Sequence, residues 1–107
     1  MPDAPIEFIK QCVAGGQVRW TYHVTMRLLQ RGLAAEILRD AAATLEIVEA
    51  YPQDKYLPSF LVRGESEELV FHAQIATDLE GDNVRIVTMY VPDPSEWDEG
   101  LRVRRNR

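Results

Sequence analysis

The fold of this chain is decided by the stretch from Leu69 to Val91, which reads LVFHAQIATDLEGDNVRIVTMYV. Two runs of residues with high β-propensity, 69–77 and 84–91, flank the sequence Glu-Gly-Asp-Asn at 80–83, which is typical of a turn. Because the connection is short, we expect the two runs to form neighbouring antiparallel strands.

Further elements are predicted upstream of this hairpin. Strands are expected at 45–51, ended by Pro52, and at 59–63, ended by Gly64. Apolar residues at helical spacing predict helices at 5–14, 23–31 and 34–43, with a short extended piece at 17–22. The chain is therefore predicted to be an α+β domain, with N-terminal helices packed on one face of a four-stranded antiparallel sheet.

Alternation along the strand at 84–91 predicts which side chains share a face. One set is expected in the core and comprises Val87, Met89 and Val91. The other set comprises Ile86, Thr88 and Tyr90, so that Thr88 and Tyr90 would offer two hydroxyls to a ligand on the opposite face.

The 107 residues correspond to a single domain, with a core over about 5–97 and a basic tail at 98–107 whose final arginines are expected to be mobile. The lone cysteine, Cys12, is expected to be a buried small hydrophobe. No signal peptide or membrane-length apolar run is visible, so the expected location is the cytoplasm, away from membranes.

Charge is unevenly distributed along the chain. The net charge is −5, and all 17 acidic residues precede residue 100. Four arginines lie in the last six residues, which leaves 8 basic against 17 acidic residues, or −9, in the rest. An acidic body does not favour nucleic-acid binding, so any site for a polyanion must be a local basic patch.

One such patch is predicted on the helix at 23–31. At 100° per residue, His23, Arg27 and Arg31 fall on one side of this helix together with Gln30. Guanidinium groups match phosphate oxygens, and histidine can move a proton near neutral pH. A solvated polar face paired to nearby carboxylates is the simpler interpretation of the same spacing.

Other residues are weaker candidates. The segment at 51–59 is long for a hairpin connection, and its Lys55 could reach a bound anion or be an ordinary exposed lysine. His72 and His23, without clustered carboxylates or thiols, are too little for a metal site, so no metal and no cofactor are predicted.

Several segments together resemble the domain-of-unknown-function 4258 family. They are HVTMR at 23–27, QRGL at 30–33, LEIVEAYP at 45–52, PSFLVRG at 58–64, His72, and TMYVP at 88–92. That family is similar in layout to toxin ribonucleases of the RelE and barnase–colicin kind. The resemblance implies metal-independent RNA cleavage, and an antitoxin protein and RNA as partners.

The resemblance also implies site residues. His23 and Arg27 match the family's histidine–arginine helix motif, and Arg31 matches its arginine–glycine helix end. Thr88 and Tyr90 match its threonine–aromatic strand motif. The expected roles are catalysis by His23, Arg27 and Tyr90, and substrate binding by Arg31, Lys55 and Thr88.

Two alternatives remain open. Toxin ribonucleases of this kind are usually basic, whereas this chain is acidic, which favours a non-catalytic protein-interaction domain, such as a homodimer joined through a sheet edge. A small-molecule pocket walled by Tyr51, Tyr56 and Tyr90 is the other alternative.

Overall fold

The computed structural model describes residues 4–105, which form a mixed α+β fold. In chain order, the elements are α1 (Pro5–Gly15), β1 (Val18–Arg19), α2 (Tyr22–Arg31), α3 (Glu36–Asp40), the 3-10 helix η1 (Ala42–Thr44), β2 (Glu46–Tyr51), β3 (Ser59–Ser66), β4 (Leu69–Asp78) and β5 (Asn83–Tyr90). None of the helices in this part of the chain is long and apolar enough to cross a membrane.

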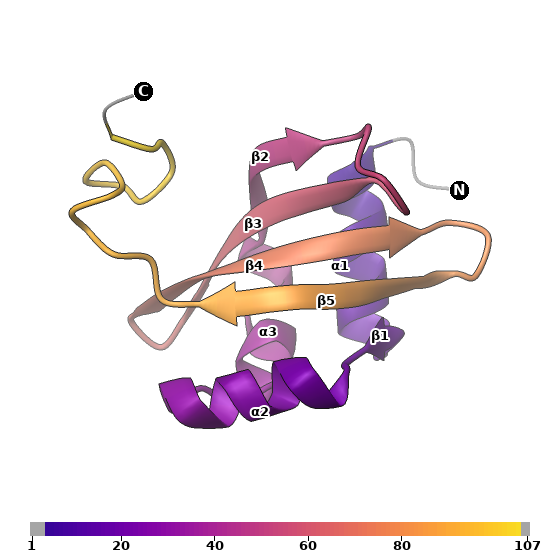
Figure 1. Cartoon of the computed structure of the whole chain (residues 1–107), viewed down its shortest axis with the longest axis horizontal. Helices are drawn as coiled ribbons and strands as arrows, with labels where there is room; N and C mark the ends of the chain where they lie inside the picture. Colours follow the sequence, from indigo (N-terminus) through magenta and orange to yellow (C-terminus); the bar gives the residue numbers. More distant parts are fainter. Residues whose placement is uncertain (1–3, 106–107) are drawn as a thin grey trace.

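The strands form one open sheet in the order β1-β5-β4-β3-β2 (Figure 1). The four strands from β2 to β5 pair antiparallel, as the sequence predicts. The sheet nevertheless has five strands rather than four. The extended piece after α1 supplies β1, which pairs parallel with β5 at the sheet edge.

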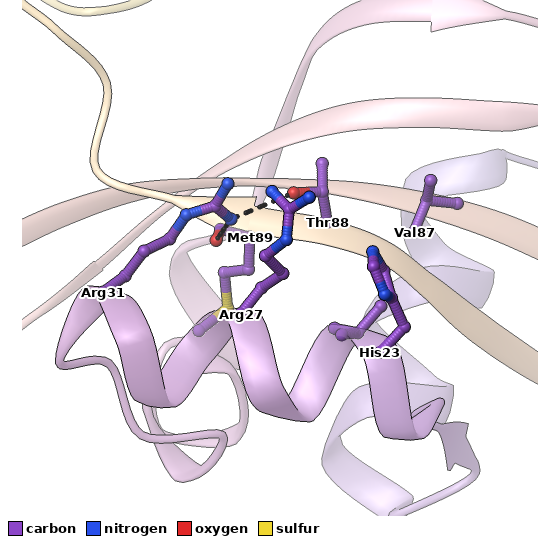
Figure 2. A pocket seen from close by; sticks show the side chains of 7 residues that line it. His23, Arg27, Arg31, Val87, Thr88 and Met89 are labelled. Atoms are coloured by element: carbon purple, nitrogen blue, oxygen red, sulfur yellow. Dashed lines mark hydrogen bonds between the residues drawn. The ribbon is translucent and has the colours of Figure 1, made fainter.

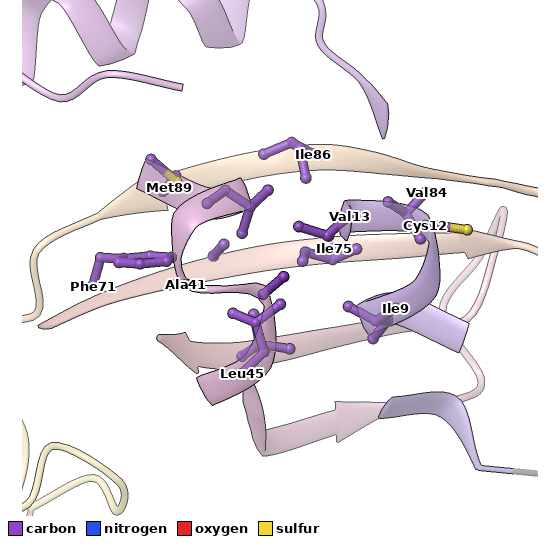
Figure 3. Close-up of a cluster of buried hydrophobic side chains, with 14 of the residues drawn as sticks. Ile9, Cys12, Val13, Ala41, Leu45, Phe71, Ile75, Val84, Ile86 and Met89 are labelled. Carbon is purple, nitrogen blue, oxygen red and sulfur yellow. The ribbon is translucent and has the colours of Figure 1, made fainter. Parts of the chain in front are cut away.

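One face of the sheet is covered by α1 and α3, which lie behind it in Figure 1. Ile9 and Val13 of α1 join Phe71 and Ile75 of β4 in one buried apolar cluster (Figure 3). Cys12 belongs to the same cluster and is buried, as expected. Burial, and then the charge of Asp82, raises the pKa of its thiol, so Cys12 stays protonated at neutral pH.

Helix α2 runs along the edge of β5 instead of lying across the sheet (Figure 1). Because β1 pairs only with Val84 and Arg85, α2 is free to pack beside the rest of β5. The helix begins where the Thr21 side chain accepts a hydrogen bond from the Val24 amide, and it ends at Gly32, which has a φ of 69°.

The buried face of α2 is narrow. Val24 and Leu28 are buried, but Leu29 and Met26 are 68% and 37% exposed. A helix at a sheet edge meets the protein along a thin stripe, and this explains why the wider apolar arc is not buried.

The predicted helix at 34–43 is wrong in its second half. Only Glu36–Asp40 is α-helical, and the chain then tightens into η1. The Thr44 hydroxyl bonds to the Ala41 carbonyl and to backbone groups of Glu65 in β3. These contacts turn the chain into β2, so tertiary structure overrides the helical preference of the alanine run.

Strand β3 does not end at Gly64 as predicted but continues to Ser66. Gly64 pairs with Phe71 across the sheet, and a Cβ atom at this position would lie 2.5 Å from the Phe71 ring. The glycine therefore permits close packing of the aromatic ring on the strand, and it does not stop the strand.

The predicted faces of β5 are partly wrong because the strand contains a β-bulge. Thr88 pairs with Gln74 and Ile86 pairs with Ile75, so Val87 is an extra residue. Ile86 therefore shares the buried side with Met89, whereas Val87 and Val91 are about half exposed, at 54% and 51%. Thr88 and Tyr90 remain on the opposite face, paired with Gln74 and His72 of β4.

The tail packs against that opposite face, so its expected mobility is wrong for the described arginines. Trp97 is 1% exposed and its ring lies edge-on to His72, with centroids 4.5 Å apart. Arg104 donates two hydrogen bonds to Glu49, and Arg102 donates one to Glu46. Arg107, the last of the predicted mobile residues, lies outside the described part of the chain.

Candidate active site

A cleft of about 210 Å³ lies between α2 and β5 (Figure 2). It is lined by His23, Val24, Arg27, Arg31, Val87, Thr88 and Met89. The three polar residues from α2 are each four positions apart, so they follow one side of the helix. The structure therefore brings three of the predicted site residues next to a fourth, Thr88 of β5. The three are His23, Arg27 and Arg31.

Arg31 is anchored to the strand by its own side chain. Its Nη1 donates to the Met89 carbonyl at 2.8 Å and to Thr88 Oγ1 at 3.2 Å. The bond to Met89 satisfies a strand carbonyl at a position where β1 no longer pairs with β5. Arg31 therefore stabilises the fold, and its Nε and Nη2 make no hydrogen bond within residues 4–105 and can face an anion.

Arg27 and His23 make no such attachment. Within residues 4–105, neither side chain takes part in a hydrogen bond or an ion pair, and both are exposed. No carboxylate lines the cleft either. The cleft is thus the local basic patch that an acidic chain would need in order to hold a phosphate group.

Two predicted site residues lie outside the cleft. Tyr90 packs edge-on against His72, with ring centroids 5.7 Å apart, and burial raises the pKa of its phenol, which therefore keeps its proton. Lys55 lies in the loop between β2 and β3, with its Nζ 5.6 Å from the centre of the Tyr56 ring. Tyr51, which was predicted to wall a small-molecule pocket with Tyr56 and Tyr90, donates a hydrogen bond to Glu49.

His72 belongs to the cluster under the tail. It is fully buried, its Nε2 lies 2.8 Å from the Leu101 carbonyl oxygen, and its Nδ1 has no partner among the described residues. Burial, assisted by the charges of Arg63 and Arg104, lowers the pKa of His72 and keeps it neutral. The part of the chain that the structure describes holds no group of three or more His, Cys, Asp or Glu placed to bind a metal ion.

Sequence reasoning missed two features near the site. Val87 was assigned to the core, but the bulge turns it into the cleft wall, and strict alternation cannot reveal a bulge. The attachment of Arg102 and Arg104 to β2 was also missed. The carboxylates of Glu46 and Glu49 in an otherwise apolar strand were the available signal for it.

Comparison with known proteins identifies the family. A family model described as "Domain of unknown function (DUF4258)" matches residues 20–91. The chain belongs to the DUF4258 family. The DUF4258 match begins two residues before α2 and ends at Val91, the residue after β5. It contains every residue of the cleft but neither α1 nor the tail. No curated protein and no solved structure matches this chain.

Proposed function

We propose that this DUF4258 protein is an endoribonuclease-like toxin module of a bacterial toxin–antitoxin pair, acting in the cytoplasm. The observation that carries the proposal is the cleft, where His23 and Arg27, without protein partners among the described residues, stand beside the anchored Arg31. A proton-transfer group next to cationic side chains is what phosphodiester cleavage without a metal requires.

The proposed reaction uses the RNA 2′-hydroxyl as the nucleophile. His23 takes the proton of this hydroxyl, the 2′-oxygen bonds to phosphorus, and the bond from phosphorus to the 5′-oxygen breaks. Arg27 and the free N–H groups of Arg31 stabilise the negative charge that grows on the phosphorane. The leaving oxygen takes a proton from water, because neither Tyr90 nor Lys55 lines the cleft.

Thr88 has a supporting role in this account. Its hydroxyl accepts a hydrogen bond from Arg31 Nη1, which together with the Met89 carbonyl fixes the guanidinium plane against β5. Tyr90, next but one along the strand, supports the same region through its packing on His72. A fixed cation loses less entropy on binding phosphate than a free one, so this anchoring favours catalysis.

The test is incubation of the purified protein with RNA in the presence of a chelator. We expect His23→Ala to lower the cleavage rate about 10²- to 10⁴-fold and Arg27→Ala about 10²- to 10³-fold. Arg39→Ala, which removes an exposed arginine of α3 away from the cleft, is the matched control and should cleave as the wild type does. Equal cleavage by all variants, or none by any protein, would contradict the proposal.

A second candidate is a protein-interaction domain, and the exposed side of α2 favours it. Tyr22, Met26 and Leu29 are 80%, 37% and 68% exposed at helical spacing, which gives α2 an exposed apolar stripe that a partner could cover. A dimer through the free edge of β2 is less favoured, because that strand carries a register irregularity between Ile47 and Glu49.

This second candidate predicts a homodimer formed through α2. Sedimentation should show a dimer for the wild type and a monomer for Leu29→Glu, whereas a substitution in the β2 edge, Val48→Glu, should leave the dimer intact. If the wild type sediments as a monomer at every concentration measured, the homodimer is refuted.

A further inference from the structure

A second hollow adjoins the cleft. This groove has a volume of about 520 Å³ and extends from α2 across β5 to the loop between β2 and β3. His23, Val24 and Val87 line both the cleft and the groove. The two hollows therefore meet at these residues, and the bulged Val87 forms part of the wall between them.

The groove differs chemically from the cleft. Leu57, Ala76 and Val87 give it apolar walls, and Tyr56 adds an aromatic side chain that is 87% exposed. Arg85 also lines the groove, but its guanidinium is paired with Asp78. The guanidinium groups of Arg27 and Arg31 in the cleft have no carboxylate partner among residues 4–105. The cleft can therefore bind an anion, and the adjoining groove can bind a flat, largely apolar group.

The Asp54 carboxylate lines the groove and can accept hydrogen bonds from a ligand. Asp54 accepts hydrogen bonds from the Ser59 hydroxyl at 2.6 Å and from the Lys55 amide at 2.9 Å. These bonds lower the pKa of the carboxyl, so it stays ionised at neutral pH. An ionised carboxylate keeps spare acceptor capacity, which suits the N–H groups on the edge of a nucleobase.

His23 occupies the junction of the two hollows. Of the titratable residues that line the groove or the cleft, it is the one that lines both. In an RNA strand, the 2′-hydroxyl lies between a base and the phosphate on its 3′ side. A phosphate held by Arg27 and a base held in the groove would therefore bring this hydroxyl to His23.

We propose that the groove binds the nucleoside that carries the attacking 2′-hydroxyl, with its base stacked on Tyr56, and that the substrate is single-stranded RNA. This inference rests on the proposed function. The volume of the groove lies within the range usual for ligand sites. A base in a duplex is stacked and paired, so it cannot enter such a groove, whereas an unpaired base can stack on an exposed aromatic ring.

The test measures binding separately from cleavage. Fluorescence anisotropy is recorded with a labelled 2′-fluoro RNA oligonucleotide, which lacks the nucleophile, as a single strand and as a blunt duplex. Tyr56→Ala should weaken binding of the single strand roughly 5- to 100-fold. Tyr56→Phe, which keeps the ring, should bind as the wild type does. Leu79→Ala removes another exposed apolar side chain, one that lines neither the groove nor the cleft, and should have no effect.

The outcomes separate this inference from the proposed function. If Arg27→Ala weakens binding but Tyr56→Ala does not, the phosphate cleft stands and the base-binding groove is refuted. If Tyr56→Ala weakens the single strand and the duplex equally, the groove does not select unpaired bases and the inference fails. If Arg27→Ala has no effect, or if neither RNA binds, the proposed function fails together with the inference.

Discussion

The molecule carries two clusters of basic residues that look alike in sequence and differ in structure. In the tail, Arg104 and Arg102 are paired with Glu49 and Glu46, and the Arg104 guanidinium lies over the Trp97 ring at 4.5 Å. On α2, Arg27 has no carboxylate partner among the described residues, and Arg31 is bonded only to neutral oxygens of β5.

The comparison shows that the availability of a basic cluster to a ligand depends more on whether its arginines are paired with carboxylates than on how many arginines it has. In the tail, Arg102 and Arg104 form ion pairs with glutamates of β2, and these pairs attach the tail to the sheet. The α2 cluster is smaller, yet its charge stays available to a ligand. We therefore propose that the tail cluster stabilises the fold and that the α2 cluster binds the ligand.

The largest effect on stability is expected from Trp97→Ala. Its side chain is 1% exposed and lies between the His72 ring and the Arg104 guanidinium. Loss of a buried tryptophan typically costs about 3–5 kcal/mol of unfolding free energy. Urea unfolding would measure this cost, with Tyr22→Ala as the control because that side chain is exposed. An unfolding free energy unchanged within about 0.5 kcal/mol would show that the tail does not hold the fold.

A smaller effect is expected from Glu49→Gln. The change removes the charge that accepts two hydrogen bonds from Arg104 and one from Tyr51, and should cost about 1–3 kcal/mol of unfolding free energy. Glu80→Gln, in the exposed turn between β4 and β5, is the matched control. Equal stability of the two variants in urea would contradict the assignment of the tail cluster to stability.

The same cluster should make the unfolding free energy depend on pH. Burial lowers the pKa of His72 below its ordinary 6.5, so the unfolded chain binds this proton first and stability falls as the pH drops below about 6.5. Burial alone would raise the pKa of Glu49, but hydrogen bonds from Arg104 and Tyr51 outweigh it and lower the pKa below 4.5. A further loss of stability is therefore expected below pH 4.5.

Urea unfolding at several pH values would check this dependence. The slope between pH 5 and 6.5 should be at most about 1.4 kcal/mol per pH unit for one group. It should be smaller in His72→Gln, which removes the titrating ring. An identical slope in that variant would show that His72 does not carry the effect.

The fold was predictable from sequence where the signal is local. The antiparallel hairpin of β4 and β5 follows from the turn residues between them. Helical spacing predicted α2 at 23–31, within one residue of its observed bounds, Tyr22–Arg31. The bulge at Val87 and the parallel strand β1 were not predictable, because they depend on how distant segments meet.

The candidate site was also predictable only where its residues belong to one element. The helical spacing of His23, Arg27 and Arg31 was enough to place these residues on one side, and the structure puts that side against Thr88. Tyr90 was grouped with Thr88 through alternation, but it lies against His72 instead of in the cleft. Sequence spacing locates residues within one element, whereas their partners come from tertiary packing.

The smallest effect on stability is expected from Arg27→Ala. Since this side chain is exposed and has no partner among residues 4–105, its removal should change the unfolding free energy by no more than about 0.5 kcal/mol. The matched change in the tail, Arg104→Ala, should cost more, because it leaves Glu49 without its cation. A larger loss for Arg27→Ala than for Arg104→Ala, measured in urea, would reverse the comparison.

The most direct test of the division between the two clusters is a titration with inorganic phosphate, followed by NMR of the arginine Nε–H groups. We predict that the signals of Arg27 and Arg31 shift with phosphate concentration while that of Arg104 stays in place. Shifts confined to the tail arginines, or no shift of any arginine signal, would contradict the account.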